Sequence, residues 1–446
     1  MEIDLTEAKD TLVVTKIFLS GNEKTKAKII YNELLFHIGD SIVKEDLHNQ
    51  IIQSKNNLNN TSLFNFVYIN YWLTDEEQLY MDIKVDERWY LWALPILEQG
   101  DRNLSTFFKT GDWSRINYGL YLKKENFRGM NEIVRFKIRL GFLNEFDLSY
   151  ESADYNYKLG WGAMLRYRAN AQVSYNTLNN VDNVIKVESG FAQQESLVNV
   201  LFKYRSNHVN RHSVNIGYNA IHIADTVAKL NPDYLLDGNT SLEFLSLKYS
   251  YSIDYRDSKV FPLRGNLLRA SALKSGFGIF TSTYNDLALQ LEYLQFGNIH
   301  KRFYYGWQFG SKYGSSKDNP FVFNKGLGTS EFLNGYEYNV IRGTSYAYSK
   351  QKVIFELVPT QTANLKFIPL KQFSKLHYAF YLRTFFDTGY VYDANQDPSN
   401  FMSNTFLYSY GLGIDMVTYY DRVLSVNYAI NKFGQSGFYI HVNMSL

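Results

Sequence analysis

The spacing of reactive side chains in this 446-residue chain favours charge pairing over catalysis. Cysteine is absent, which excludes a thiol nucleophile, a disulfide framework and Cys-ligated zinc or iron–sulfur sites. The eight histidines show no metal-ligand spacing such as H-E-x-x-H, and the sequence has neither a Gly-Xaa-Ser-Xaa-Gly turn nor a glycine-rich phosphate loop. We therefore expect no enzyme activity, no metal and no cofactor.

Two carboxylates, Glu356 and Asp387, form a candidate site together with the loop that precedes them. Lys352, Ile354 and Glu356 alternate with apolar residues, and Asp387 begins an Asp-Thr-Gly cluster. By the parity of their strands, both carboxylates can face a polar interior. A buried carboxylate needs a partner, and a bidentate arginine is the strongest one at neutral pH. The alternative for Asp387 is an Asx turn at a strand end, which its co-occurrence with Glu356 disfavours.

Long strands must position these side chains. From about residue 88 the sequence alternates apolar and polar residues with a period of two, as Arg135, Lys137 and Arg139 do against their apolar neighbours. Sixteen such segments start near residues 89, 115, 132, 146, 160, 196, 212, 244, 265, 285, 302, 346, 377, 406, 421 and 436. An even number of strands of about 10 residues, each with one charged face, predicts a closed transmembrane antiparallel β-barrel.

The composition also favours a membrane barrel. Aromatic residues make up 17% of the chain, with 37 Tyr and 32 Phe, because amphipathic rings suit the two membrane interfaces. A soluble β-sandwich or β-propeller is the alternative, but it would seldom expose Phe, Leu and Tyr on so many faces. The formal net charge of +2 implies no nucleic-acid partner.

The N-terminal sequence bears on export. No uncharged apolar run approaches the roughly 20 residues of a membrane helix. Residues 1–4 are acidic and lack the apolar region of a signal peptide. Because a barrel protein must be exported, we expect that the native signal was removed and a Met added.

Residues 11–87 predict a small α/β unit ahead of the barrel, in the order β-α-α-β-β. A strand ends at Gly21, and Thr25 can cap the first helix. A second helix follows, and two strands, at 66–73 and 79–85, close the unit.

These features together resemble the BamA/TamA/FhaC superfamily of outer-membrane barrels, and residues 11–87 resemble a single polypeptide-transport-associated (POTRA) domain. The resemblance covers essentially the whole chain. Its motifs are Gly21-Asn22, Thr25, Glu33-Leu34, Gly39-Asp40, Leu63-Phe64, Val85-Asp86-Glu87-Arg88, Asn117-Tyr118-Gly119, Asn126-Phe127-Arg128-Gly129, Phe261-Pro262-Leu263-Arg264-Gly265-Asn266 and Gly326–Glu337. It implies a barrel at residues 88–446 in the bacterial outer membrane, with the domain at 11–87 in the periplasm.

In that family, the loop after the eleventh strand folds into the lumen, where an Arg followed by Gly and an aromatic meets two carboxylates. The corresponding segment, residues 315–345, is called the inward loop below. Gly335 and Tyr336 match the family pattern, as do the two carboxylates, but Asn334 stands in the place of the Arg.

An amide cannot neutralise two carboxylates, so the resemblance implies a substitute cation. Arg342, on the same loop, is the first candidate, and Arg383, on the face of Asp387, is the second. The other possibilities are that the loop is not held in place or that the carboxylates are solvated.

Two edges are candidate binding surfaces for client polypeptides. The resemblance implies a weakly paired seam between the first barrel strand (89–98) and the last (437–446), where Pro95 removes a ladder donor or simply marks a strand end. Gly437 and the terminal Leu446 belong to the same seam. In the small domain, the exposed edge is expected on the strand that contains Phe66, Val67, Tyr68 and Ile69.

The expected function is insertion or translocation of polypeptides by a non-enzymatic outer-membrane machine. Its expected partners are outer-membrane lipids, unfolded client polypeptides and, as further candidates, periplasmic chaperones or accessory lipoproteins. The alternatives are a two-partner-type secretion pore for one cognate substrate, a structural or adhesive surface barrel, and a passive porin. A wide lumen free of the inward loop would favour the porin.

Overall fold

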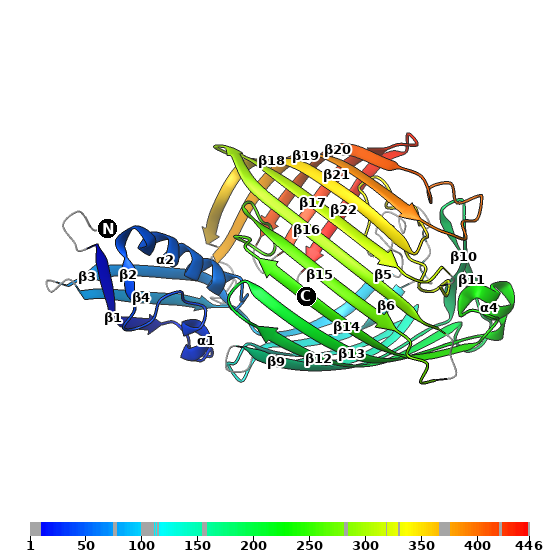
Figure 1. The fold of residues 1–446 in the computed structure, drawn as a ribbon, viewed down its shortest axis with the longest axis horizontal. Coiled ribbons are helices and arrows are strands. Elements are labelled where there is room, and N and C mark those ends of the chain that lie inside the picture. The colour runs from blue at the N-terminus through cyan, green and yellow to red at the C-terminus, as the bar shows by residue number, and fades with distance from the viewer. Residues whose placement is uncertain are drawn as a thin grey trace.

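The computed structural model consists of a small α/β domain beside one end of a large barrel (Figure 1). It describes residues 10–74, 78–99, 111, 113, 116–153, 158–280, 284–317, 319–328, 331–364, 375–418 and 422–444. Leu446, assigned above to the seam, lies outside these residues.

The small domain is a four-stranded sheet covered by helices, in the strand order β2-β1-β4-β3. Its elements are β1 (Thr11–Ser20), α1 (Ala27–Tyr31), β2 (Ser41–Val43), α2 (Lys44–Asn59), β3 (Phe64–Leu73) and β4 (Gln78–Glu87). Leu47 and Leu58 of α2 are buried against Leu79 and Met81 of β4 in one apolar core. Burying a side chain of this size contributes about 1.5–3 kcal/mol.

The predicted order of this domain is correct except at its first helix and at one short strand. α1 has only five residues, and its N-cap is Lys26, without a side-chain cap bond. Thr25 does not cap the helix, because its hydroxyl is hydrogen-bonded to Tyr90 (3.1 Å) and Asn126 (2.8 Å). The short strand β2, which pairs with β1, follows Asp40.

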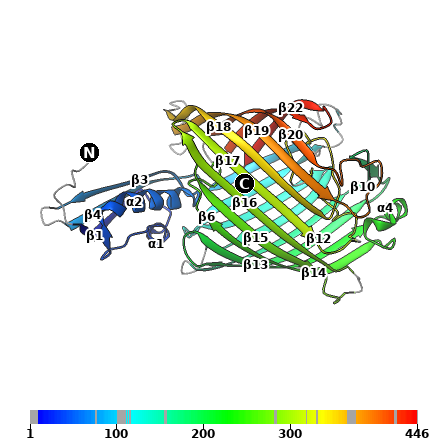
Figure 2. The ribbon, with the colours of Figure 1, turned by 45° about the horizontal axis from the view of Figure 1, so that its top comes forward.

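The barrel wall is a 16-stranded sheet in which sequence neighbours pair with one another, except that β12 pairs with β9. Its strands are β5 (Leu91–Gln99), β6 (Ile116–Phe127), β7 (Glu132–Gly141), β8 (Leu143–Glu151), β9 (Leu159–Asn170), β12 (Gln193–Arg205), β13 (Asn210–Ile223), β14 (Ser241–Asp254), β15 (Gly265–Ser275), β16 (Asp286–His300), β17 (Phe303–Gly314), β18 (Ser345–Asn364), β19 (Lys375–Tyr392), β20 (Leu407–Thr418), β21 (Arg422–Asn431) and β22 (Ser436–Met444). All these pairs are antiparallel, and the strands are tilted against the barrel axis (Figure 2). The predicted transmembrane barrel is thereby confirmed.

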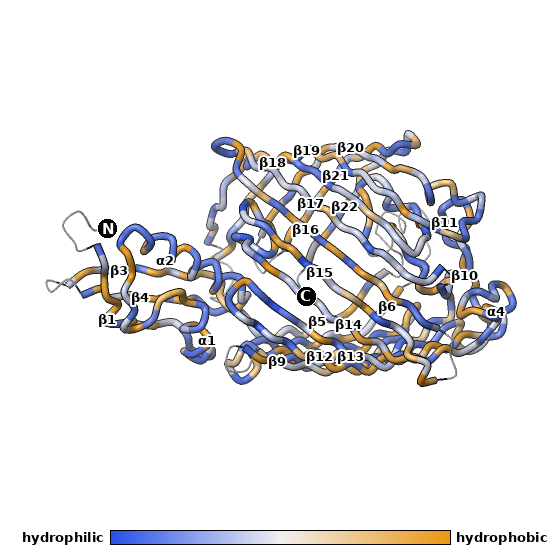
Figure 3. The backbone as a smooth tube through the Cα atoms, in the orientation of Figure 1, coloured by the Kyte–Doolittle hydropathy of each residue, from blue (hydrophilic) through white to orange (hydrophobic). Residues whose placement is uncertain are grey.

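The period-two pattern separates the outer from the lumenal face. On β12, the outward side chains Val198, Phe202 and Tyr204 are 44%, 51% and 42% exposed. Lys203 lies between them in sequence, points inward and forms an ion pair with Glu151 (2.9 Å). Hydrophobic and hydrophilic segments therefore alternate along the barrel strands (Figure 3).

The two mouths of the barrel differ. The mouth next to the small domain (the domain-side mouth) includes the turn at residues 255–264, whereas the opposite one (the far mouth) carries structured segments beyond the wall strands (Figure 1). These segments include the hairpin of β10 (Gln172–Leu178) and β11 (Val181–Lys186), the helix α4 (Asp225–Leu230) and the 3-10 turn η2 (Pro232–Tyr234). Within the described residues, no helix has the length and apolarity needed to cross a membrane.

Candidate functional site

The inward loop lies against the inner wall of the barrel. Its buried side chains Leu333, Tyr336 and Ile341 pack with Tyr348 of β18 and Val391 of β19 in one apolar cluster. The loop continues directly into β18, whose ladders with β17 and β19 set the position of the facing side chains.

Asn334 binds Asp387 through two hydrogen bonds. Its backbone N–H and its Nδ2 both donate to Oδ2 of Asp387, at 3.1 and 2.7 Å. Its Oδ1 accepts a hydrogen bond from Nδ2 of Asn427 on β21 (3.0 Å). The amide therefore bridges two strands, and each of its ends meets a group of complementary polarity. Because Asp387 is 1% exposed, these hydrogen bonds substitute for its lost hydration.

Gly335 and Tyr336 extend the contact to β20 and β21. The backbone oxygen of Gly335 accepts a hydrogen bond from Asn431 (2.8 Å), and the Tyr336 hydroxyl donates one to the backbone oxygen of Tyr408 (2.9 Å). Gly335 has φ +84°, a left-handed conformation that favours glycine. A Cβ at this position would lie 3.6 Å from Cβ of Ser409, so the loop backbone approaches the wall closely. These hydrogen bonds of residues 334–336 are called the loop lock below.

Arg342, the first candidate for a substitute cation, lies elsewhere. Its Nη2 pairs with Asp182 of β11 (3.0 Å), and its Nε donates to the Thr177 hydroxyl of β10 (2.8 Å). The guanidinium also lies 3.9 Å from the ring centroid of Phe321. Arg342 therefore joins the inward loop to the far-mouth hairpin.

Arg383, the second candidate, lies in the lumen wall but pairs with another carboxylate. Its Nε lies 2.9 Å from Oδ2 of Asp415, and its Nη2 donates to Asn427 (2.6 Å). Glu356 makes no ion pair with any described residue. The structure thus brings Asn334, Gly335, Tyr336 and Asp387 together, with Glu356 apart from them.

Sequence reasoning missed two lysines near this site. Lys350 of β18 lies directly opposite Asp387 of β19 in the strand register, and Lys352 is the next residue on the same face. Both line a lumenal cavity of about 210 Å³ together with Asn334, Arg383 and Asp387. The sequence could have indicated both lysines. Residues 350, 352, 354 and 356 lie on the same face of one strand, and Asp387 lies on the next strand.

The inward loop also contacts the last strand. The ring of Phe332 stacks on His441 of β22, with centroids 5.0 Å apart and planes at 17°. His441 Nε2 lies 3.3 Å from a Glu337 carboxylate oxygen. The loop therefore supports β22 from inside the lumen.

β5 and β22 are the two ends of the strand order, and no ladder joins them among the described residues. Pro95 lies opposite Leu120 in the ladder with β6, and Gly437 lies opposite Ala429 in the ladder with β21. The other side of each strand faces the seam.

β3 of the small domain is likewise an edge strand, since it pairs with β4 alone. Val67 is buried in the domain core, whereas Tyr68 is 43% exposed. Phe66 lies near the barrel, with its ring 6.2 Å from that of His377. Ile69 is partly buried against the core.

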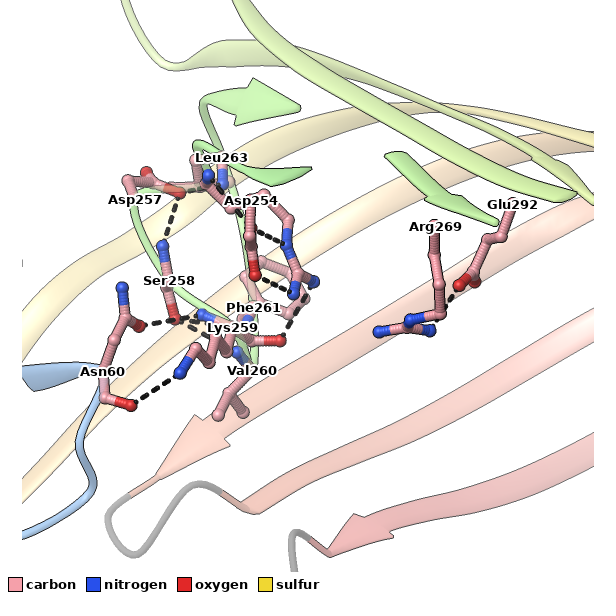
Figure 4. A network of polar contacts seen from close by, with 11 residues as sticks. Asn60, Asp254, Asp257, Ser258, Lys259, Val260, Phe261, Leu263, Arg269 and Glu292 are labelled. Atoms are coloured by element: carbon pink, nitrogen blue, oxygen red, sulfur yellow. Dashed lines mark hydrogen bonds and ion pairs between the residues drawn. The ribbon is translucent and has the colours of Figure 1, made fainter. Parts of the chain in front are cut away.

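Two polar contacts attach the small domain to turns of the domain-side mouth. Glu33 forms a bidentate pair with Arg205 at the end of β12, with N–O distances of 2.6 and 2.7 Å. Burial acts to raise the pKa of Glu33. The hydrogen bonds and charge of Arg205, together with the charges of His208 and Arg211, hold that pKa below its usual value. The second contact involves Asn60, which accepts hydrogen bonds from the backbone N–H (3.1 Å) and from Nζ (3.0 Å) of Lys259 (Figure 4).

The turn that carries Lys259 (residues 255–264) also reaches into the lumen. Oδ1 of Asp257 accepts hydrogen bonds from the backbone N–H groups of Ser258 (2.8 Å) and Leu263 (3.1 Å), which fixes the turn (Figure 4). The ring of Phe261 then stacks on Tyr381 of β19, with centroids 4.5 Å apart. The same turn therefore touches the small domain and the lumen wall.

Comparisons with known proteins agree with this architecture. BamA from Haemophilus ducreyi lacking POTRA domains 1–3 is similar with a TM-score of 0.54 and 13% identity, over 97% of this chain and 84% of that one. CdiB from Escherichia coli is similar with a TM-score of 0.57 and 11% identity (97% and 76% covered), and CdiB from Acinetobacter baumannii with 0.52 and 13% (97% and 74% covered). At these identities the likeness concerns the fold.

A search of curated proteins found no match to the sequence. The family model of the Omp85 superfamily domain, however, matches residues 126–441, which is more than half of the chain. The chain therefore belongs to the Omp85 superfamily, and its barrel has the fold that BamA and CdiB share.

Proposed function

We propose that this protein inserts or translocates polypeptides at the outer membrane, with clients received by a periplasmic POTRA domain at residues 11–87. The observation that carries the proposal is the pair of open strand edges. β5 and β22 end the barrel sheet without a ladder between them in the described residues, and β3 ends the small sheet. An exposed edge offers unpaired backbone donors and acceptors to an extended client strand.

The loop lock supports insertion more directly than secretion through the lumen. A polypeptide that moved through the lumen would have to displace the inward loop, which the bonds of Asn334 and Tyr336 attach to three strands. A client that adds to the seam leaves that loop in place. The free energy for insertion would come from folding of the client, without nucleotide hydrolysis.

A seam-locking experiment tests the proposal in this naturally Cys-free chain. Leu97→Cys is combined in turn with Phe438→Cys, Ile440→Cys and Val442→Cys, all of which are on the exposed outer face of β5 or β22. The protein is placed in liposomes, and folding of an added urea-denatured outer-membrane barrel is followed by its heat-modifiable electrophoretic mobility. We expect the wild type to accelerate client folding and a closed seam disulfide to abolish that acceleration, with recovery on reduction.

The matched control is a disulfide between two strands that already pair. Val426→Cys with Ile440→Cys joins register partners on β21 and β22 and leaves the seam untouched. It should retain full acceleration. If the seam disulfides form and client folding continues unchanged, insertion at the seam is excluded. If the wild type never accelerates folding, a secretion pore or a surface structure becomes the better reading.

A further inference from the structure

The lumenal cavity gathers basic side chains on one part of the wall. Its 210 Å³ lie between β16–β19, β21 and the inward loop. Lys350, Lys352 and Arg383 line it, and Asp387 is the acidic residue among its lining side chains. Arg383 already pairs with Asp415 beside the cavity (2.9 Å), so Lys350 and Lys352 carry the remaining positive charge of the lining.

The two lysines have no carboxylate partner within ion-pair distance among the described residues. Nζ of Lys350 lies 5.3 Å from the ring centroid of Phe332, and Nζ of Lys352 lies 5.3 Å from that of Phe296. Neither ammonium group donates a hydrogen bond to a described residue. Contacts of a cation with a ring replace only part of the hydration that a charged amine loses on burial, so a nearby anion stabilises the site.

Cations on the opposite part of the wall are arranged differently. Lys137 and Arg139 of β7 pair with Glu145 at 3.2 and 2.7 Å, and Arg166 of β9 pairs with Asp147 at 2.7 Å. These three lumenal cations therefore each have a carboxylate partner. At the cavity, by contrast, Asp387 is the one carboxylate of the lining, and it forms no ion pair with Lys350 or Lys352.

Glycines on neighbouring strands make room for these basic side chains. Gly306 is the register partner of Lys352, and a Cβ there would lie 2.7 Å from Cε of that lysine. Gly413 is the register partner of Arg383, and a Cβ there would lie 3.1 Å from its Nε. Without these glycines the long side chains could not lie flat along the wall.

From this geometry we propose that the cavity binds a phosphate group. A phosphate monoester near neutral pH carries close to two negative charges, which complement the two ammonium groups of Lys350 and Lys352. Lysine and arginine are the side chains that bind phosphate most strongly. Further polar groups in the lining are Gln308, Ser425, Asn427 and His441, and the rings of Phe296, Phe332 and Phe385 add apolar surface. The volume, that of about seven water molecules, admits phosphate with a small organic substituent. This site does not depend on the client-handling role proposed above.

Calorimetric titration of the whole protein in a zwitterionic detergent tests the site. Inorganic phosphate and glycerol 3-phosphate are the soluble probes, and phosphatidic acid in mixed micelles is the lipid-borne probe. We expect saturable binding of at least one probe, weakened about tenfold or more by Lys350→Gln or Lys352→Gln. The double variant should not bind, and Gly306→Ala, which keeps every charge but displaces Lys352, should bind more weakly than wild type.

Lys137→Gln is the matched control, because it also removes a lumenal lysine but one that has a carboxylate partner. It should bind like wild type. Heat-modifiable mobility verifies that each variant is folded. Binding of the soluble probes would identify a soluble phosphate, and binding of phosphatidic acid alone would identify a lipid headgroup. The proposal is overturned if no probe binds saturably to the wild type, or if the double variant binds as the wild type does.

Discussion

At the residue scale, the loop lock pairs a neutral amide with a buried carboxylate. Asn334 donates to Asp387 and accepts from Asn427, so one amide satisfies two groups of opposite hydrogen-bonding character. Oδ1 of Asp387 accepts no hydrogen bond from the described residues, and Lys350 lies opposite it in the register. The negative charge is therefore met by a hydrogen-bonded amide and a nearby lysine.

A series of substitutions at Asn334 tests this arrangement. Asn334→Ala removes both side-chain hydrogen bonds and should weaken the loop lock by about 1–3 kcal/mol. Asn334→Asp places a second carboxylate against Asp387 and should weaken it further. Occupancy of the lock is compared between backgrounds from disulfide formation in Gly335→Cys/Ser409→Cys, since a Cβ at 335 would lie 3.6 Å from that of Ser409. The strain that a Cys adds at the left-handed φ of residue 335 is the same in every background, so a difference between them reports the change at Asn334. Equal crosslinking in the wild-type, Asn334→Ala and Asn334→Asp backgrounds would contradict the lock. Asn239→Asp, in an exposed far-mouth segment, is the control.

At the element scale, the turn between β14 and β15 links the small domain to the lumen. Lys259 contacts Asn60 of the domain, while Phe261, two residues later, stacks on Tyr381. Nζ of Lys352 in the lumenal cavity lies 5.9 Å from the ring centroid of Phe261. A movement of the domain relative to the barrel would therefore be felt by side chains that line the cavity.

The pair of Glu33 and Arg205 should make domain docking depend on pH. Because docking holds the pKa of Glu33 below its ordinary value of about 4.5, the docked state is favoured above that pH and loses this stabilisation as the pH falls through the lowered pKa. His208 and Arg211 face the same carboxylate, so protonation of Glu33 leaves positive charges close together.

Spin labels at Ile38→Cys and Leu159→Cys measure the domain–barrel distance across this pH range. Arg205→Ala leaves Glu33 buried without its partner and should cost about 3 kcal/mol of docking at neutral pH. The double variant Glu33→Gln with Arg205→Gln should recover part of the docking free energy that Arg205→Ala loses. A narrow distance distribution that is unchanged by Arg205→Ala would show that this ion pair does not hold the domain.

Most of the elements could be predicted from the sequence, whereas contacts between them could not. β7, β15 and β22 begin at residues 132, 265 and 436, which are the starts predicted from the alternation of polar and apolar residues. A strand with one face in water and one in lipid must alternate with a period of two. The β10–β11 hairpin lies between the strands predicted to start near residues 160 and 196 and was not itself predicted, since its strands lie in neither environment. The partner of Arg342 lies 160 residues away in sequence, and strand parity alone does not bring such groups together.

At the scale of the whole molecule, segments from three parts of the chain meet and bind one another at the far mouth. Asn180, at the tip of the β10–β11 hairpin, is fully buried. Its backbone N–H donates to Asn400 (2.9 Å), and its backbone oxygen accepts from Val340 of the inward loop (2.8 Å). Arg342 adds the ion pair to Asp182 in the same hairpin. These contacts predict a barrel that conducts ions poorly in spite of its sixteen strands.

Planar-bilayer recording tests this closure. The wild type should show small, infrequent conductance steps, because the hairpin and the inward loop obstruct the lumen. Arg342→Ala removes the ion pair to Asp182 and the hydrogen bond to Thr177 (2.8 Å) and should increase both the size and the frequency of the steps. Arg269→Ala is the matched control, since it breaks an ion pair with Glu292 (2.5 Å) whose arginine is half exposed. A large, steady conductance in the wild type would mean that the lumen is open, and transport through the lumen would then displace the seam as the route for clients.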